Sequence, residues 1–298
     1  MSFGDLVRKC RLDRGWTKED LCGDESQLSV RQLTRLESGA SKPTLAKIEF
    51  LASRLGIPTY QLMTDYVDLP QEYLDKKYVA LRWASFGDRK KLDEIVLAIE
   101  DIAEQFYEIL PEDERVMIWL LRCRMKMCKE QIVGERTPIF DDYFEQVKRR
   151  DWYSINDLLL LQVYFLACQL QSSLFEVSLY THIVDRVIEQ EEHIPVKDWF
   201  LLRDLIIAIL TAGLEFQVEY KAKELVKTLE RMMDMTQDYQ KKVIVDLLKW
   251  KVALFMEQAE SEAKKSYHEA YHFAKQLGDD YLLKQIEQEW EQDWKLFS

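Results

Sequence analysis

The residues best suited to chemistry lie in one short stretch, LSVRQLTRLESGASKPTL, which runs from Leu28 to Leu45. Arg31 and Arg35 are four residues apart, so on a helix they project from one face. Arginine reads guanine and glutamine reads adenine in the major groove of DNA. The outer face of this predicted helix, with the following turn, therefore gives the candidate DNA-binding residues Arg31, Gln32, Thr34, Arg35, Ser38, Lys42 and Lys47.

An arginine pair at this spacing is also common on an ordinary solvated helix. The order of the surrounding motifs favours the DNA-reading interpretation. Lys42 and Lys47 flank the start of the next predicted helix, and helix N-termini favour phosphate. We therefore expect both lysines to contact the phosphate backbone of DNA, which positions the protein without reading bases. One such module makes few contacts, and a two-fold dimer on half-sites about 34 Å or a multiple apart is the usual solution.

Short helices must position these side chains. We call the predicted helix that carries Arg31 and Arg35 the reading helix. Ser29 can cap its start, and Gly39 ends it. Apolar spacing predicts a first helix from Phe3 to Leu12, TKED is a capping box for a short second helix, and a fourth helix closes at Gly56. Residues 1–64 are therefore predicted to form a helix-turn-helix domain.

The charge of the chain is divided unevenly. The net charge is -12, but residues 1–64 carry 10 Lys and Arg against 8 Asp and Glu, while the remainder carries 31 against 45. A mildly basic head is thus joined to a strongly acidic body. The body cannot lie along phosphates, but it can compete with DNA for the arginines of the head.

The body is predicted to be helical throughout. After a linker at residues 65–74, long helical patterns are separated by few Gly and Pro, and no strand alternation is evident. Near the end, Ala270 and Ala274 follow the spacing of a tetratricopeptide helix. The fold class is therefore all-α: the helix-turn-helix domain, then a tetratricopeptide-like α-solenoid at residues 75–298. The last helix carries Trp290 and Trp294, which either cap the solenoid or pack on a second chain.

Isolated polar residues interrupt otherwise apolar helices of the body. Such groups must be satisfied by partners or water. They either bond to one another between repeats or line a groove that holds an extended peptide. The candidate peptide-binding residues are Asn156, Gln162, Gln169, Arg203, Asp246 and Lys249. Arg203 could also meet a carboxylate, either on a neighbouring helix or at a peptide terminus.

Several other classes are disfavoured. No apolar run reaches the roughly 20 residues that span a bilayer, and no apolar signal core suggests export, so we expect a cytoplasmic protein without membrane contact. Five scattered cysteines fit a reducing compartment. The string HEAYH from His268 to His272 matches HExxH, but it lies inside the repeat spacing. We expect no metal, no cofactor and no enzymatic activity.

The head contains the motifs LSVRQLTRLESG and LASRLG. The body contains EILPEDE (108–114), DDYFEQVKRR (141–150) and SINDLLLLQVYF (154–165). With these motifs, the head followed by this body resembles the peptide-sensing regulators of Gram-positive bacteria, the RRNPP group. It is most similar to the Rgg-type regulators, especially the ComR competence regulators of streptococci.

The resemblance implies a quorum-sensing transcription factor switched by an imported short peptide pheromone. Acidic residues at the start of the body would hold the reading-helix arginines until the peptide binds in the solenoid. The matching acids here are Glu112 and, nearby, Glu114, with Arg31 and Arg35 as partners. Where the family pattern has another arginine, this chain has Lys47, and this departure weakens any bidentate role there.

The implied partners are promoter DNA, the peptide and a second copy of the chain: a monomer without peptide and a homodimer with it. RNA polymerase is a further candidate partner, and activation of competence-type genes is the implied output. The alternatives are a repressor of the same architecture and a peptide- or protein-binding scaffold with no transcriptional role. A buttressing role is expected for Glu37, which in this fold class braces the reading helix.

Overall fold

The computed structural model of the chain describes residues 2–57, 59, 62–63, 69–84, 86–133, 138–190 and 194–297. The predicted linker at 65–74 falls partly outside them, because residues 64–68 are not described. Every regular element in the described ranges is helical, which confirms the all-α prediction.

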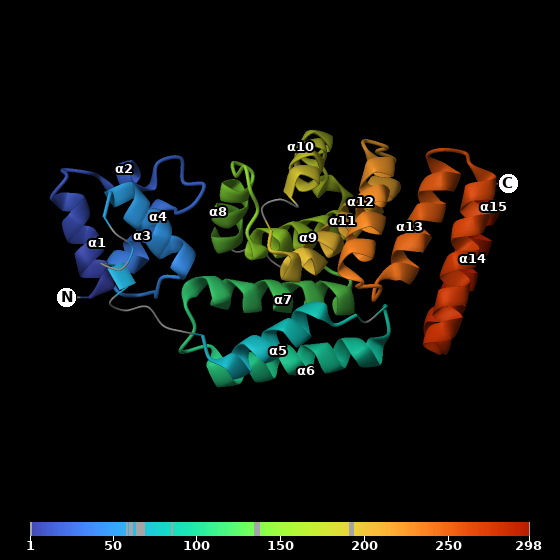
Figure 1. The fold of residues 1–298 in the computed structure, drawn as a ribbon, viewed down its shortest axis with the longest axis horizontal. Coiled ribbons are helices and arrows are strands. Elements are labelled where there is room, and N and C mark those ends of the chain that lie inside the picture. Colours follow the sequence, from blue (N-terminus) through green and yellow to red (C-terminus); the bar gives the residue numbers. More distant parts are fainter. Residues whose placement is uncertain are drawn as a thin grey trace. The chain divides into compact units, whose positions relative to one another are not determined.

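The helices follow one another along the chain (Figure 1). In chain order they are α1 (Phe3–Leu12), α2 (Lys18–Cys22), α3 (Val30–Glu37), α4 (Leu45–Leu55), α5 (Gln71–Arg82), α6 (Arg89–Phe106), α7 (Glu112–Glu130), α8 (Pro138–Val147), α9 (Ile155–Leu170), α10 (Val177–Glu189), α11 (Trp199–Glu215), α12 (Ala222–Thr236), α13 (Lys242–Phe255), α14 (Glu260–Leu277) and α15 (Asp280–Phe297), with the short 3-10 helices η2 (Ser172–Leu174) and η4 (Val196–Asp198).

The chain forms two compact units. The first unit combines Met1–Ala80 with Leu97–Arg122 and Glu135–Asn156. The second unit combines Leu81–Val96 with Cys123–Gly134 and Asp157–Ser298. The first unit thus joins the four helices of the head to the beginning of α7 and to α8.

Side-chain caps define the helices of the head. The side chains of Ser2, Thr17, Ser29 and Thr44 each accept a hydrogen bond from the backbone N–H three residues later, at the starts of α1 to α4. Each cap satisfies a donor that the first turn would otherwise leave unpaired. These helices gather into one cluster, drawn in blue in Figure 1, around buried side chains such as Val7, Leu33 and Leu51.

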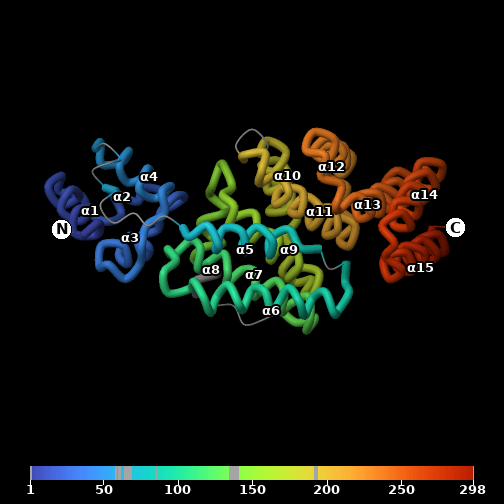
Figure 2. The backbone as a smooth tube through the Cα atoms, turned by 60° about the horizontal axis from the view of Figure 1, so that its bottom comes forward, coloured from blue at the N-terminus to red at the C-terminus, as the bar shows by residue number. Residues whose placement is uncertain are grey.

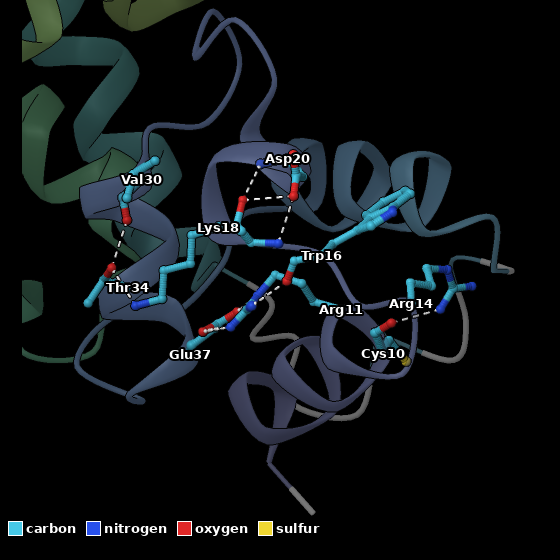
Figure 3. Close-up of polar contacts among 10 residues, drawn as sticks. Cys10, Arg11, Arg14, Trp16, Lys18, Asp20, Val30, Thr34 and Glu37 are labelled. Carbon is cyan, nitrogen blue, oxygen red and sulfur yellow. Dashed lines mark hydrogen bonds and ion pairs between the residues drawn. The ribbon is translucent and has the colours of Figure 1, made fainter.

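Two contacts fix α3 against α1. A Cβ added to Gly4 would lie 2.2 Å from the backbone oxygen of Leu36, so only glycine allows this approach. Arg11 donates from Nε and Nη2 to the two carboxylate oxygens of Glu37, at 2.7 and 2.9 Å, and from Nη1 to the Trp16 carbonyl (Figure 3). Both charged side chains are buried. Glu37 therefore braces the reading helix rather than presenting a charge to solvent.

The second unit is built from helices that pack on their neighbours and on the next helix but one. α11 packs against both α12 and α13, and α13 packs against α14 and α15. Figure 2 shows α14 and α15 side by side at the C-terminal end. Ala270 and Ala274 are fully buried where α14 meets α13, as small residues must be at a close helix approach.

Aromatic stacking joins the last helix to this array. The Trp290 ring stacks on Tyr267 with ring centroids 4.5 Å apart. The buried Asp293 carboxylate accepts hydrogen bonds from Trp250 Nε1 and Lys251 Nζ at 2.8 and 2.7 Å. α15 is therefore attached to α13 and α14 by both apolar and polar contacts.

Candidate functional site

The reading helix α3 directs its arginines toward carboxylates of the same unit. Arg35 Nη1 donates to Glu112 Oε1 at 2.6 Å, and Glu112 is the first residue of α7. The second oxygen, Glu112 Oε2, is buried and has no hydrogen-bond partner among the described residues. Arg31 Nη1 donates to Asp142 Oδ2 of α8 at 2.9 Å, and this pair is exposed.

A third cation of the head is held more deeply. Lys47 Nζ donates to Asp113 Oδ1 at 2.9 Å, and the Thr44 hydroxyl donates to Asp113 Oδ2 at 3.0 Å. Burial raises the pKa of Asp113, but the Lys47 ammonium and these hydrogen bonds outweigh it, so the pKa lies below its ordinary value. We call Glu112, Asp113 and Asp142 the acidic clamp.

Two further contacts support the acidic clamp. Asn156, at the start of α9, donates from Nδ2 to the backbone oxygen of Asp113 at 2.7 Å. Arg150 donates from Nε to the backbone oxygen of Ser26, in the loop before α3. Asn156 was predicted to bind peptide, but its place in the first unit is beside the clamp.

Glu114 is turned away from α3. Its carboxylate accepts hydrogen bonds from the Tyr73 hydroxyl and from Lys77 Nζ, the latter at 2.8 and 2.9 Å. Both partners belong to α5. Glu114 therefore ties α7 to α5, whereas the two acids before it face the head.

The other candidate DNA-binding residues make local contacts. Gln32 closes the capping box of α3, with its side-chain oxygen accepting from Ser29 N at 3.1 Å. Thr34 Oγ1 donates to Val30 O and accepts from Lys18 Nζ at 2.9 Å, as Figure 3 shows. Ser38 donates to the backbone oxygen of Arg35, and Lys42 is exposed.

In the second unit, two glutamines that are candidate peptide-binding residues line the same cavity. Gln162 and Gln169 line a cavity of about 200 Å³, together with Arg124, Asp204 and Lys241. Gln162 Oε1 accepts from Arg124 Nη1 at 2.8 Å, and its Nε2 donates to the Leu201 carbonyl at 3.1 Å. We call this cavity the amide pocket.

Opposite charges face one another in the amide pocket. Burial lowers the pKa of Lys241, whose Nζ lies 3.9 Å from Asp204 Oδ2. Burial alone would raise the pKa of Asp204, but Lys241, Arg203 and Arg124 together hold it below its usual value. The pocket thus combines side-chain amides, which donate and accept, with a half-buried lysine and a buried aspartate.

The remaining peptide-binding candidates lie elsewhere in the second unit. Arg203 Nε lies 3.2 Å from Asp204 Oδ1 and lines a different cavity. Asp246 accepts from Lys242 Nζ at 2.7 Å, and burial raises its pKa to about 6. Lys249 donates to Glu230 at 2.6 Å. Asp246 and Lys249 are not among the residues that line the amide pocket.

Sequence reasoning missed Asp113, Asp142 and Arg150 at the clamp and Arg124 and Lys241 at the amide pocket. Asp113 stands between two acids that were considered, and DDYFEQVKRR contains both Asp142 and Arg150, so the signals were present in the motifs. For Arg124 and Lys241 we find no signal in the sequence.

Within the described ranges, no cluster of three or more His, Cys, Asp and Glu side chains could hold a metal ion. None of the helices described there is long and apolar enough to cross a membrane.

Comparisons with known proteins cover nearly the whole chain. The ComR tetratricopeptide family model matches residues 70–290, and a helix-turn-helix model matches residues 7–62. ComR from Streptococcus suis is 34% identical, with 98% of this chain and 96% of that chain covered and a TM-score of 0.76. The tetratricopeptide-like and helix-turn-helix predictions are thereby confirmed.

Two further solved structures are similar at 28% identity. The apo form of the competence regulator ComR from Streptococcus vestibularis has a TM-score of 0.81, with 98% of this chain and 97% of that chain covered. ComR from S. thermophilus, solved with DNA and its signalling peptide ComS, has a TM-score of 0.70, with 98% and 99% covered. A search of curated proteins found no match.

Proposed function

The chain belongs to the ComR family of Rgg-type transcription regulators, which are not enzymes, and on that premise we propose how it acts. It is a cytoplasmic quorum-sensing factor that binds an imported peptide pheromone. Peptide binding releases the helix-turn-helix domain, which dimerises on promoter DNA and activates competence-type genes with RNA polymerase.

One observation carries this proposal. Three of the candidate DNA-binding cations, Arg31, Arg35 and Lys47, are each paired with a carboxylate of the acidic clamp. The nitrogen atoms that would contact phosphates or bases are the ones that contact the clamp. DNA and the clamp therefore compete for the same groups, and only one of them can be bound at a time.

The strength of the clamp suits a switch. An exposed ion pair contributes about 0–1 kcal/mol, and the half-buried pairs of Arg35 and Lys47 contribute somewhat more. Together the three pairs would stabilise the closed arrangement by about 1–3 kcal/mol. A ligand that prefers the open arrangement by about twice this free energy reverses such an equilibrium.

The amide pocket is the proposed peptide site. An extended peptide exposes N–H and C=O groups, and Gln162 and Gln169 can pair with both. α7 carries Glu112 and Asp113 in its first turn and Arg124 and Cys128 near its end. A peptide that displaces Arg124 from Gln162 would thus act on the helix that also supplies the clamp.

The first test measures binding of a short fluorescent duplex of arbitrary sequence, because the clamp should oppose all DNA. Glu112→Gln keeps the side-chain size and removes the charge that faces Arg35. We expect its affinity to rise about threefold to tenfold over that of the unaltered chain. Glu104→Gln is the matched control, since Glu104 is an exposed residue of α6.

Equal affinities of Glu112→Gln and Glu104→Gln would remove the clamp from the account. Arg35→Ala should bind the duplex weakly under all conditions, and full retention of affinity would show that the wrong face of α3 was chosen.

The pheromone is tested by repeating the assay on promoter fragments with peptide-sized fractions of spent medium from the source organism. A rise in affinity that is lost in Gln162→Leu would support the amide pocket.

A further inference from the structure

A second cavity of the second unit has no role in the function proposed above. It measures about 300 Å³ and opens between the end of α12 and the start of α11. Its apolar wall consists of Trp199, Phe200, Met232, Met233 and Met235. We call it the methionine pocket.

A buried guanidinium lines this apolar cavity. The Arg203 side chain is only 3% exposed, and its Nε is directed to Asp204. Nη1 lies 3.0 Å from Asp238 Oδ2 but outside hydrogen-bond geometry, and neither Nη1 nor Nη2 has a hydrogen-bond partner among the described residues. The donors of a buried guanidinium in a native protein are normally satisfied. The unused Nη1 and Nη2 donors of Arg203 therefore indicate that a ligand in the cavity accepts from them.

Three basic side chains line the methionine pocket. Arg82 Nη1 lies 3.8 Å from the same Asp238 oxygen that faces Arg203, so two guanidinium groups share one carboxylate. Lys197 adds a third positive charge to the lining. Asp204, which pairs with Arg203 Nε, and Asp198, which lies 3.7 Å from Lys197 Nζ, are not among the lining residues, so Asp238 is the carboxylate that the three cations meet inside the cavity.

We propose that the methionine pocket binds an apolar group that carries a carboxylate. The planar fork of Arg203 can hold a carboxylate through two parallel hydrogen bonds. Methionine and aromatic walls accommodate apolar bodies of varied shape. A volume of about 300 Å³ is at the lower end for small-molecule sites, which fits one large side chain or a short acyl chain.

Two sources supply this chemistry: the last residue of a peptide and a free fatty acid. The amide pocket and the methionine pocket share none of the residues that line them. The proposal does not require the chain to bind DNA or a pheromone, so it can fail or succeed independently of the proposed function.

The pocket offers its own spectroscopic probes. Three of the nine methionines of the chain line it, so methyl-labelled methionine spectra report on this cavity separately from the other six. The full chain is titrated with N-acetyl-L-phenylalanine, with its uncharged carboxamide, and with octanoate. We expect the acids to shift the signals of Met232, Met233 and Met235, and the carboxamide to bind at least tenfold more weakly.

Variants separate binding from folding. Arg203→Met should weaken acid binding about tenfold or more. Because that residue is buried, Val196→Asp is a second variant: Val196 is 59% exposed at the pocket, and the added negative charge should repel the acid without disturbing the core. Lys223→Met, on the exposed side of α12, removes one positive charge away from the pocket and should leave binding unchanged.

The proposal is overturned if neither acid shifts the three signals, or if the carboxamide binds as well as the acid. It is equally overturned if Val196→Asp and Lys223→Met change acid affinity to the same extent. Tighter binding of N-acetyl-L-phenylalanine supports a peptide terminus as the occupant, and tighter binding of octanoate supports a free acid.

Discussion

Asp113→Asn is the substitution that most directly measures the acidic clamp. Asparagine keeps the size of the side chain and can still accept from the Thr44 hydroxyl, but it removes the charge opposite Lys47. The Lys47 side chain is 10% exposed and that of Asp113 is 30% exposed. Exposed pairs contribute about 0–1 kcal/mol, whereas breaking a buried pair costs about 3–5 kcal/mol.

The partly buried Lys47–Asp113 pair lies between these limits, at about 1–2 kcal/mol. Since 1.4 kcal/mol corresponds to a factor of ten, the variant should bind a short duplex about five to thirty times more tightly than the unaltered chain. Because the pKa of Asp113 lies below its ordinary value, its carboxylate stays charged above pH 5. The clamp would be lost only as the pH falls through that lowered pKa, so the gain should be equal at pH 5.5 and 7.5.

Fluorescence anisotropy at a fixed salt concentration of about 0.1 M measures this gain, since DNA affinity depends steeply on salt. Asp101→Asn is the control, because Asp101 pairs with Lys76, away from the head helices. If Asp101→Asn and Asp113→Asn raise affinity equally, the effect is one of net charge and the clamp reasoning is refuted. The gain should also vanish when Lys47 is replaced by methionine in both backgrounds.

Two predictions concern stability. Gly4→Ala places a Cβ 2.2 Å from the Leu36 carbonyl oxygen, so the free energy of unfolding of α1 and α3 should fall by about 1–3 kcal/mol. Their backbone amide protons should then exchange with solvent roughly 5 to 150 times faster, whereas the exposed Arg8→Ala should change the exchange little. Unchanged exchange in Gly4→Ala would contradict the close approach of the two helices. The pKa of Asp246 is raised to about 6, so the folded state becomes more stable as the pH falls from 7.5 to 5. In thermal unfolding, the stability of Asp246→Asn should lose this pH dependence. If the variant and the unaltered chain show the same pH dependence, another group is responsible for it.

Local rules predicted the head well because each helix there carries its own start signal. Ser29 and Gln32 form the capping box of α3, and the αL conformation of Gly56 ends α4. Apolar spacing alone was less informative about burial at the helix ends: Leu12 is the last apolar residue of the predicted first helix, yet it is 54% exposed. The last turn of α1 is buried at Arg11 instead, which pairs with Glu37 of α3.

The clamp could not be resolved from sequence, because three consecutive acids differ by about 100° around a helix. Glu112 and Glu114 were grouped by proximity along the chain, but the first-turn orientation of α7 decides their partners. That orientation directs Glu112 and Asp113 to the head and Glu114 to Lys77 of α5. The register depends on where α7 begins relative to α5, which is a tertiary property.

The pockets were harder still, because their charged residues carry no local signal. Lys241 precedes α13 in the run QKKV and would be read as a solvated end, but burial lowers its pKa and Asp204 faces it. Arg203 was recognised as a polar interruption of an apolar helix, and Asp204 is the residue that follows it. Adjacent positions on α11 point about 100° apart, so one residue lines the methionine pocket and the other the amide pocket. Two adjacent polar residues inside an apolar helix therefore indicate that two faces of that helix have polar neighbours. For α11, the packing of α12 and α13 determines which residues those neighbours are.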